Sequence, residues 1–107
     1  MKTLKFKNNL ADLILRGEKT ATWRLFDDKN LQVGDLLNFQ VKETGNNFAR
    51  AEIIDIKEKK LREVVKEDYA GIGEYEKIED KIKSLKKHYG DNVNLDTVVK
   101  IIKFKLI

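Results

Sequence analysis

The chain has 107 residues, of which 41% are hydrophobic and 37% are charged, and its formal net charge is +4. This length suits a single domain over residues 1–107 that buries one core of its own. The sequence has no cysteine and one histidine. The composition therefore excludes a disulfide framework and a thiolate metal cluster, and we expect no metal ion.

The N-terminal residues, MKTLKFKNN, do not lead into the apolar stretch of a signal peptide. No apolar run approaches the roughly 20 residues of a membrane span. We therefore expect a cytoplasmic protein that does not enter a membrane. The modest positive excess is compatible with binding to a phosphate backbone, but only a cluster of basic side chains would make a site.

Hydrophobic periodicity predicts an alternation of strands with two helices. The first helix lies between Asn8 and Gly17, with Asn8 or Asn9 as its cap and Gly17 as its end. A short helical turn is expected near Leu61. Strands are predicted over residues 3–7, 20–25, 36–42, 48–58 and 97–107, and the second helix over residues 74–89.

Two of these strands carry further information. In the strand over 48–58, Ile53 continues one alternation and Ile54 begins the opposite one, which predicts a bulge or a strong bend. In the last strand, Val98, Ile102, Phe104 and Leu106 are expected on one face. Bent strands with short connections favour the α+β class, as a small bent β-barrel of about five to six strands with two helices.

The stretch LRGEKTATWRLF, residues 15–26, is the best candidate for a site. Side chains alternate across a strand, so Thr20, Thr22 and Arg24 should share one face. The other face should carry Ala21, Trp23 and Leu25. A polar strand face with a fixed positive charge, beside the end of a helix, is suited to binding a ligand.

The pattern G-x-K-T-x-T-x-R over residues 17–24, followed by Gly34-Asp35 at the start of a strand, resembles the ASCH domain family. The resemblance covers nearly the whole chain and implies a PUA-like barrel with a cleft that takes RNA or a modified nucleoside. We expect Thr20 and Arg24 to line this cleft, and the rings of Trp23 and Tyr69 to be candidates for stacking on a base. We expect a monomer that needs no cofactor.

One small bacterial branch of the family resembles this chain in length and removes the acetyl group from N4-acetylcytidine. The resemblance implies Thr22 as nucleophile and Lys19 as base, a role that a lysine can fill when desolvation or a neighbouring cation lowers its pKa. The family's glutamate precedes a glycine, whereas Ile72 precedes Gly73 here. Glu74, which follows that glycine, is the nearest substitute, and Glu76 is a weaker one.

Simpler structural roles stay open for each of these residues. The threonines are good strand formers, Lys19 suits a helix end, and Trp23 and Tyr69 suit a core. Arg24 could equally form an ion pair with Asp35. Three functions therefore remain: binding of RNA or a modified nucleoside, amide hydrolysis, and a protein-interaction module in which the motif only tightens the junction of helix and strand.

Overall fold

Five strands and two α-helices make up the computed structural model of the chain, which describes residues 1–72 and 77–107. Two short 3-10 helices, η1 (Leu61–Glu63) and η2 (Lys66–Tyr69), follow the longest strand. The start predicted for the second helix, at residue 74, lies outside the described residues. The remaining elements are β1 (Lys2–Phe6), α1 (Asn8–Leu15), β2 (Ala21–Leu25), β3 (Leu36–Val41), β4 (Asn47–Lys60), α2 (Ile78–Tyr89) and β5 (Val98–Leu106).

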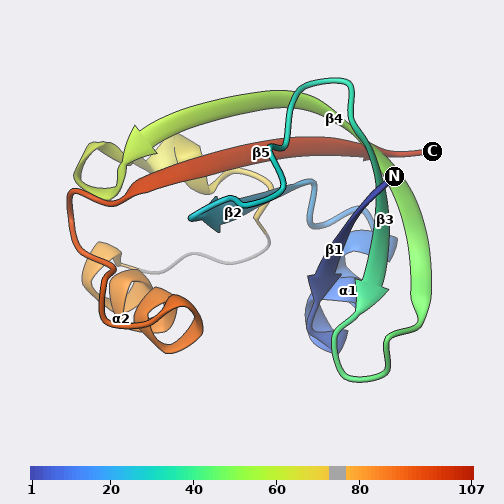
Figure 1. Cartoon of the computed structure of the whole chain (residues 1–107), viewed down its shortest axis with the longest axis horizontal. Coiled ribbons are helices and arrows are strands. Elements are labelled where there is room, and N and C mark those ends of the chain that lie inside the picture. The colour runs from blue at the N-terminus through green and yellow to red at the C-terminus, as the bar shows by residue number, and fades with distance from the viewer. Residues whose placement is uncertain (73–76) are drawn as a thin grey trace.

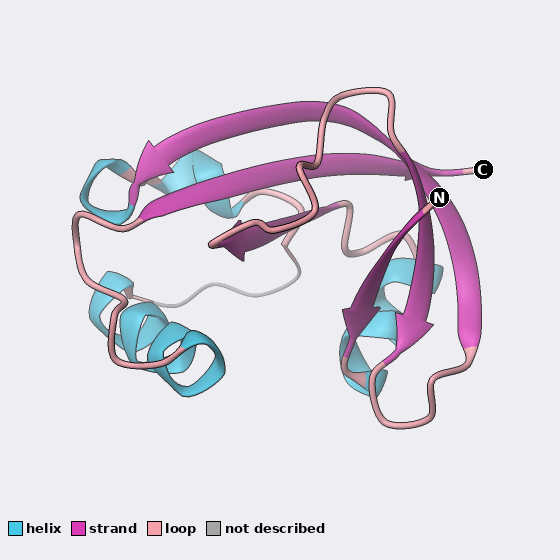
Figure 2. Cartoon of the chain, viewed as in Figure 1, coloured by secondary structure: helices cyan, strands magenta, loops and turns pink. Residues whose placement is uncertain are grey.

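The strands form one curled sheet in the order β1-β3-β4-β5-β2, which makes β2 an edge strand. β1 and β3 are parallel, and every other pair is antiparallel. β4 and β5 arch side by side over the other elements in Figure 1. Figure 2 shows the sheet as an open half-barrel with α1 and α2 at opposite ends. The predicted α+β class, a bent PUA-like barrel with two helices, is confirmed in this form.

The bend in β4 occurs where the sequence predicts it. The pairing of β4 with β5 shifts register between Ile53 and Asp55, and Ile54 is left 48% exposed between them. A bulge adds a residue to one strand only, which turns the following side chains to the opposite face and increases the twist. Because of this bulge, β4 continues as one long strand that pairs with β5 on both sides of the register shift.

Two hydrophobic clusters fill the fold. The first includes Leu4, Phe39 and Phe104, and the second includes Trp23, Leu85 and Ile101. β5 contributes to both clusters, because Ile101 belongs to the second and Ile102 to the first. Of the four residues predicted to share one face of this strand, Ile102 and Phe104 are buried, whereas Val98 and Leu106 at its ends are 50% and 43% exposed.

The start of α1 is held differently from the prediction. Neither Asn8 nor Asn9 provides a side-chain cap; the cap position is Lys7, and the Glu43 carboxylate accepts from the Asn8 N–H at 3.1 and 3.2 Å. The turn between β3 and β4 supplies the acceptor from a distant part of the sequence. The predicted end is confirmed: Gly17 has φ +78°, and the Glu18 N–H donates to the Leu13 carbonyl.

No helix in residues 1–72 or 77–107 has the length and apolar character needed to cross a membrane.

Candidate functional site

The loop between α1 and β2 is fixed to the segment that precedes α2. Lys19 is 5% exposed, and its Nζ donates to the carbonyls of Ala21 at 2.8 Å and Ile72 at 2.9 Å. The backbone N–H groups of Thr20 and Ala21 both donate to the Gly71 carbonyl, at 2.6 and 2.9 Å. The first half of the motif therefore joins two segments that are far apart in sequence.

A cleft of about 350 Å³ lies beside the second half of the motif. Its walls come from the end of β1 and the start of α1, from β2, and from α2. Ile72 and Leu85 contribute apolar surface, and Ser84 contributes a hydroxyl. This volume falls within the range of small-molecule sites and is enough for one nucleoside.

Three of the residues predicted for the site line this cleft: Thr22, Trp23 and Arg24. The alternation predicted that Trp23 would lie on the face opposite to its two neighbours. Trp23 does pack in the second cluster with Ala21 and Leu25, yet all three consecutive residues of this edge strand line the cleft. Trp23 is nevertheless only 7% exposed, and its Nε1 donates to the Asp68 carbonyl at 3.1 Å. It belongs to the core and to the cleft wall together.

The other predicted residues lie next to the cleft or elsewhere. Lys19 lies behind the wall, hydrogen-bonded to the carbonyl of the lining residue Ile72. Thr20 is exposed and its hydroxyl faces Gly71. Tyr69 packs on Trp23 with 4.9 Å between ring centroids. Glu74 and Glu76 lie outside the described residues.

The ion pair between Arg24 and Asp35, one of the two alternatives for this arginine, does not form, because Asp35 binds Lys2 at 2.7 Å. The Arg24 guanidinium lies over the Phe6 ring at 5.4 Å, and its Nη2 donates to the Lys5 carbonyl at 3.2 Å. Its Nε is buried and, among the described residues, has no hydrogen-bond partner. A buried donor without a partner is uncommon and suits an acceptor brought by a ligand.

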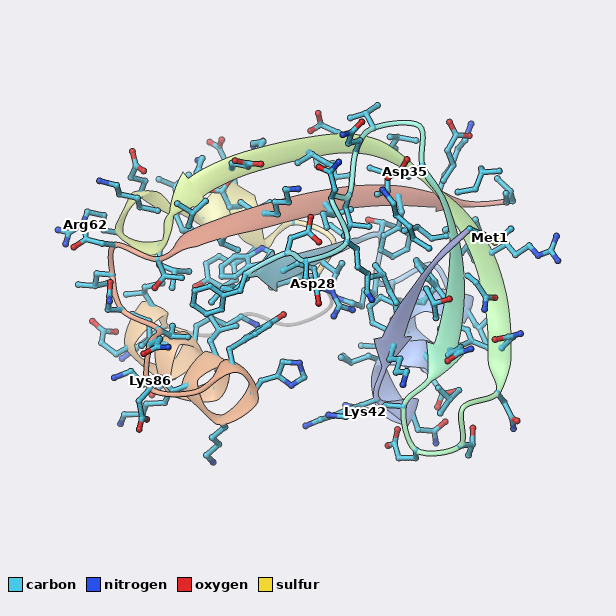
Figure 3. The ribbon with its side chains drawn as sticks, viewed as in Figure 1. Met1, Asp28, Asp35, Lys42, Arg62 and Lys86 are labelled. Carbon is cyan, nitrogen blue, oxygen red and sulfur yellow. The ribbon has the colours of Figure 1, made fainter. Side chains whose placement is uncertain are left out.

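The cleft is strongly basic, a property that sequence patterns did not reveal. Within residues 1–72 and 77–107 no aspartate or glutamate lines it. The Lys81 ammonium lies 5.2 Å from the centroid of the Trp23 ring. Figure 3 shows Lys42 extending from the end of β3 into the space on the α2 side. The basic lining residues are Lys5, Lys7, Arg24, Lys42, Lys81 and His88.

The titration of His88 reflects this environment. Partial burial lowers the pKa of His88 below its ordinary value, and the positive charges of Lys42, Arg24 and Lys7 lower it further. These cations come from three different segments of the chain. All three cations line the same cleft as His88.

Asp68 is a second residue that sequence patterns missed. It is 2% exposed, and its carboxylate accepts from Lys59 at 2.8 Å, Lys57 at 3.3 Å and the Val65 N–H at 2.9 Å. Burial by itself raises the pKa of Asp68, but these hydrogen bonds outweigh it and hold the pKa below its usual value. Asp68 thereby fixes η2, whose backbone holds the Trp23 indole.

The described residues contain no group of three His, Cys, Asp or Glu side chains that could hold a metal ion.

Comparisons with known proteins agree on the fold. A family model described as the ASCH domain matches residues 1–107. A crystal structure of a protein from Enterococcus faecalis V583 superposes with a TM-score of 0.82 at 16% identity, over 99% of this chain and 79% of that one. No curated protein matches the sequence significantly.

Two further solved structures have the same architecture. The ASCH domain from Lactobacillus crispatus JV V101 gives a TM-score of 0.75 at 21% identity, over 98% of this chain and 79% of that one. A solution structure of a Pyrococcus furiosus protein gives 0.69 at 19% identity, over 99% and 96% of the two chains. At these identities the likeness shows the fold alone, so the function has to be argued from the cleft.

Proposed function

Because the chain belongs to the ASCH domain family, we propose that it binds RNA or a modified nucleoside in the cleft that Thr22, Trp23 and Arg24 line. One observation carries the proposal: consecutive residues of the motif form the wall of a cleft whose charged lining, in the described part of the chain, is entirely basic. The proposal includes a monomer that acts in the cytoplasm.

The lining offers what a nucleoside needs. The Thr22 hydroxyl and the Arg24 guanidinium can form hydrogen bonds with the edges of a base. The buried Arg24 Nε, which has no acceptor among the described residues, is a further donor for the ligand. The apolar surface of Ile72 and Leu85 can receive the face of a base. Trp23 is too deeply packed to offer its whole ring, so we assign it to the floor of the cleft rather than to stacking.

Titration of single-stranded RNA and of a modified nucleoside into the wild type and Arg24→Ala tests this function. Loss of a hydrogen bond from a charged donor should weaken binding by about 1.5–3 kcal/mol, or roughly tenfold or more. Arg50→Ala is the matched control, because Arg50 is an exposed arginine on β4 outside the lining. Equal affinities of wild type and Arg24→Ala for both ligands would show that the ligand does not use this cleft.

A second candidate, hydrolysis of N4-acetylcytidine, draws support from the position of Thr22. This hydroxyl group lines the cleft in a side chain that is 7% exposed, and Lys19 binds the carbonyl of the neighbouring wall residue Ile72. In this mechanism Lys19 takes the Thr22 proton and Oγ1 attacks the acetyl carbonyl. The protonated Lys19 returns this proton to N4 as cytidine leaves, and water then hydrolyses the threonine ester, which releases acetate and restores the Thr22 hydroxyl group. Arg24 stabilises the negative charge on the tetrahedral intermediate.

Incubation with N4-acetylcytidine, followed by chromatography, separates this candidate from simple binding. Hydrolysis predicts release of cytidine by the wild type, its loss in Thr22→Ala and partial retention in Thr22→Ser, which keeps a hydroxyl group. If the wild type releases no cytidine, or if Thr22→Ala releases as much as the wild type, this mechanism is wrong. Binding by the cleft can still hold in either case.

A further inference from the structure

We propose that the side of the cleft formed by Lys7, Lys42 and His88 binds a phosphate group, so that the ligand is a nucleotide or an RNA rather than a free nucleoside. This inference rests on the proposed function and specifies its ligand class. It also predicts that binding is accompanied by uptake of a proton on His88.

The first argument is the convergence of charge from separate elements. Lys7 precedes α1, Lys42 follows β3, and His88 lies near the end of α2, yet all three line one cleft with Arg24 of β2. The positive charges of Lys7, Lys42 and Arg24 repel one another, and a bound anion would relieve this repulsion. A neutral nucleoside brings no charge to do so, whereas a phosphate group does.

The second argument concerns the acidic groups nearby. Glu43 adjoins Lys42 in sequence, but its carboxylate faces the start of α1 and accepts from the Asn8 N–H. In residues 1–72 and 77–107 the lining itself holds no carboxylate. Among the described residues, the charged side chains that line the cleft around His88 are cations: Lys5 on β1, Lys7 after it, Lys42 after β3, Arg24 on β2 and Lys81 on the same helix as His88.

The third argument is the state of His88. Partial desolvation and the neighbouring cations favour the neutral form of this exposed imidazole, which limits repulsion before an anion binds. A bound phosphate reverses the local charge and favours the imidazolium, which can then donate to a phosphate oxygen. Affinity should therefore rise as the pH falls toward the pKa of His88 in the bound state, with at most one proton taken up per protein chain.

The experiment compares four probes by calorimetry: cytidine, cytidine 5′-monophosphate, a short single-stranded RNA and inorganic phosphate. Cytidine 5′-monophosphate and the RNA should each bind the wild type more tightly than cytidine does. Lys42→Gln should weaken them about tenfold and reduce the salt dependence of RNA binding by about 0.7 in the log–log slope. Lys83→Gln removes the same charge from α2 outside the lining and should leave the affinities unchanged.

The pH series uses the RNA, because a phosphodiester keeps its charge where a phosphomonoester titrates near pH 6. Affinity should increase between about pH 8 and about pH 6 in the wild type and lose this increase in His88→Asn. Calorimetry in buffers of different ionisation enthalpy should detect proton uptake only in the wild type. An identical pH dependence in both proteins would overturn the role of His88.

The outcomes separate this inference from the proposed function. If cytidine binds as tightly as its monophosphate and Lys42→Gln has no effect, the phosphate site is wrong. The proposed binding function can still hold in that case. Inorganic phosphate binding without any nucleoside or RNA binding supports the site and overturns the function. Tighter binding of RNA than of the monophosphate identifies the polymer as the source of the phosphate, and the reverse order identifies a free nucleotide.

Discussion

Gly71 is the residue at which the motif and the segment before α2 approach each other most closely. Its carbonyl accepts from the Thr20 and Ala21 N–H groups, and a methyl group in place of its hydrogen would overlap the Thr20 hydroxyl. Its φ of +79° is a left-handed conformation that favours glycine. Gly71 therefore meets two separate requirements, one of conformation and one of space.

These two requirements can be separated by substitution. Gly45→Ala places a side chain in the left-handed conformation without causing a clash, because Gly45 has φ +74° and open space around it. This substitution should lower the unfolding free energy by about 1 kcal/mol. Gly71→Ala should lower it by about 1–3 kcal/mol more. Urea unfolding provides the measurement. Thr20→Ala in the Gly71→Ala background should recover the excess, and an unchanged excess would show that contact with Thr20 is not its source.

At the scale of elements, Asp68 joins η2 to β4 through Lys57 and Lys59. This ties the segment that carries Gly71 and Ile72, and with it the cleft wall, to the sheet. Asp68→Asn should lower the unfolding free energy by about 1–3 kcal/mol near neutral pH. Asp96→Asn is the control, because the Asp96–Arg62 pair is exposed on both sides and should contribute less than about 1 kcal/mol.

The contribution of Asp68 should also depend on pH in a defined direction. Its pKa is lower in the folded than in the unfolded chain, so its stabilisation is fully present above the ordinary aspartate pKa of 3.8. It is lost as the pH falls from there through the folded-state pKa. The difference in unfolding free energy between wild type and Asp68→Asn should thus shrink at about pH 3. A difference that stays constant down to that pH would contradict the assignment.

Local chemistry explains which elements the sequence could predict. The end of α1 at Gly17 and the bulge at Ile54 depend on residues adjacent to them, so both were predictable and both are confirmed. The Glu43 cap and the Asp68 pairs depend on which distant segments meet. Composition and periodicity do not reveal which distant segments contact each other. The predicted cap of α1, Asn8 or Asn9, is therefore wrong, and sequence patterns give no indication of the role of Asp68.

The same distinction applies to the site. Thr22 and Arg24 stood out because they alternate within one strand beside a glycine-ended helix. Lys42 and His88 belong to other segments of the chain. In a sequence rich in charge, a single lysine or histidine is most simply interpreted as a solvent-exposed side chain, so no pattern marks it as part of a site. Only the curled sheet, which brings the end of β3 and the helix α2 to one cleft, shows that these side chains belong together.

At the scale of the whole molecule, β5 connects two hydrophobic clusters through neighbouring residues. Ile101 packs in the cluster that contains Trp23, and Ile102 packs in the cluster that contains Phe39. β4 pairs with β5 from Lys60 to Ala51 and so runs alongside the β5 residues that enter both clusters. A sheet shared in this way should prevent either cluster from unfolding without the other.

Ile102→Ala tests that cooperativity, because it opens a cavity in the first cluster while Trp23, the sole tryptophan, reports on the second. The substitution should lower the unfolding free energy by about 2–5 kcal/mol. It should shift the tryptophan fluorescence and far-ultraviolet circular dichroism transitions in urea by the same amount. Ile54→Ala, at the exposed bulge, should change stability by no more than about 0.5 kcal/mol. A fluorescence transition that stays at its wild-type midpoint in Ile102→Ala would mean that the cleft half, with α2 and Trp23, unfolds separately.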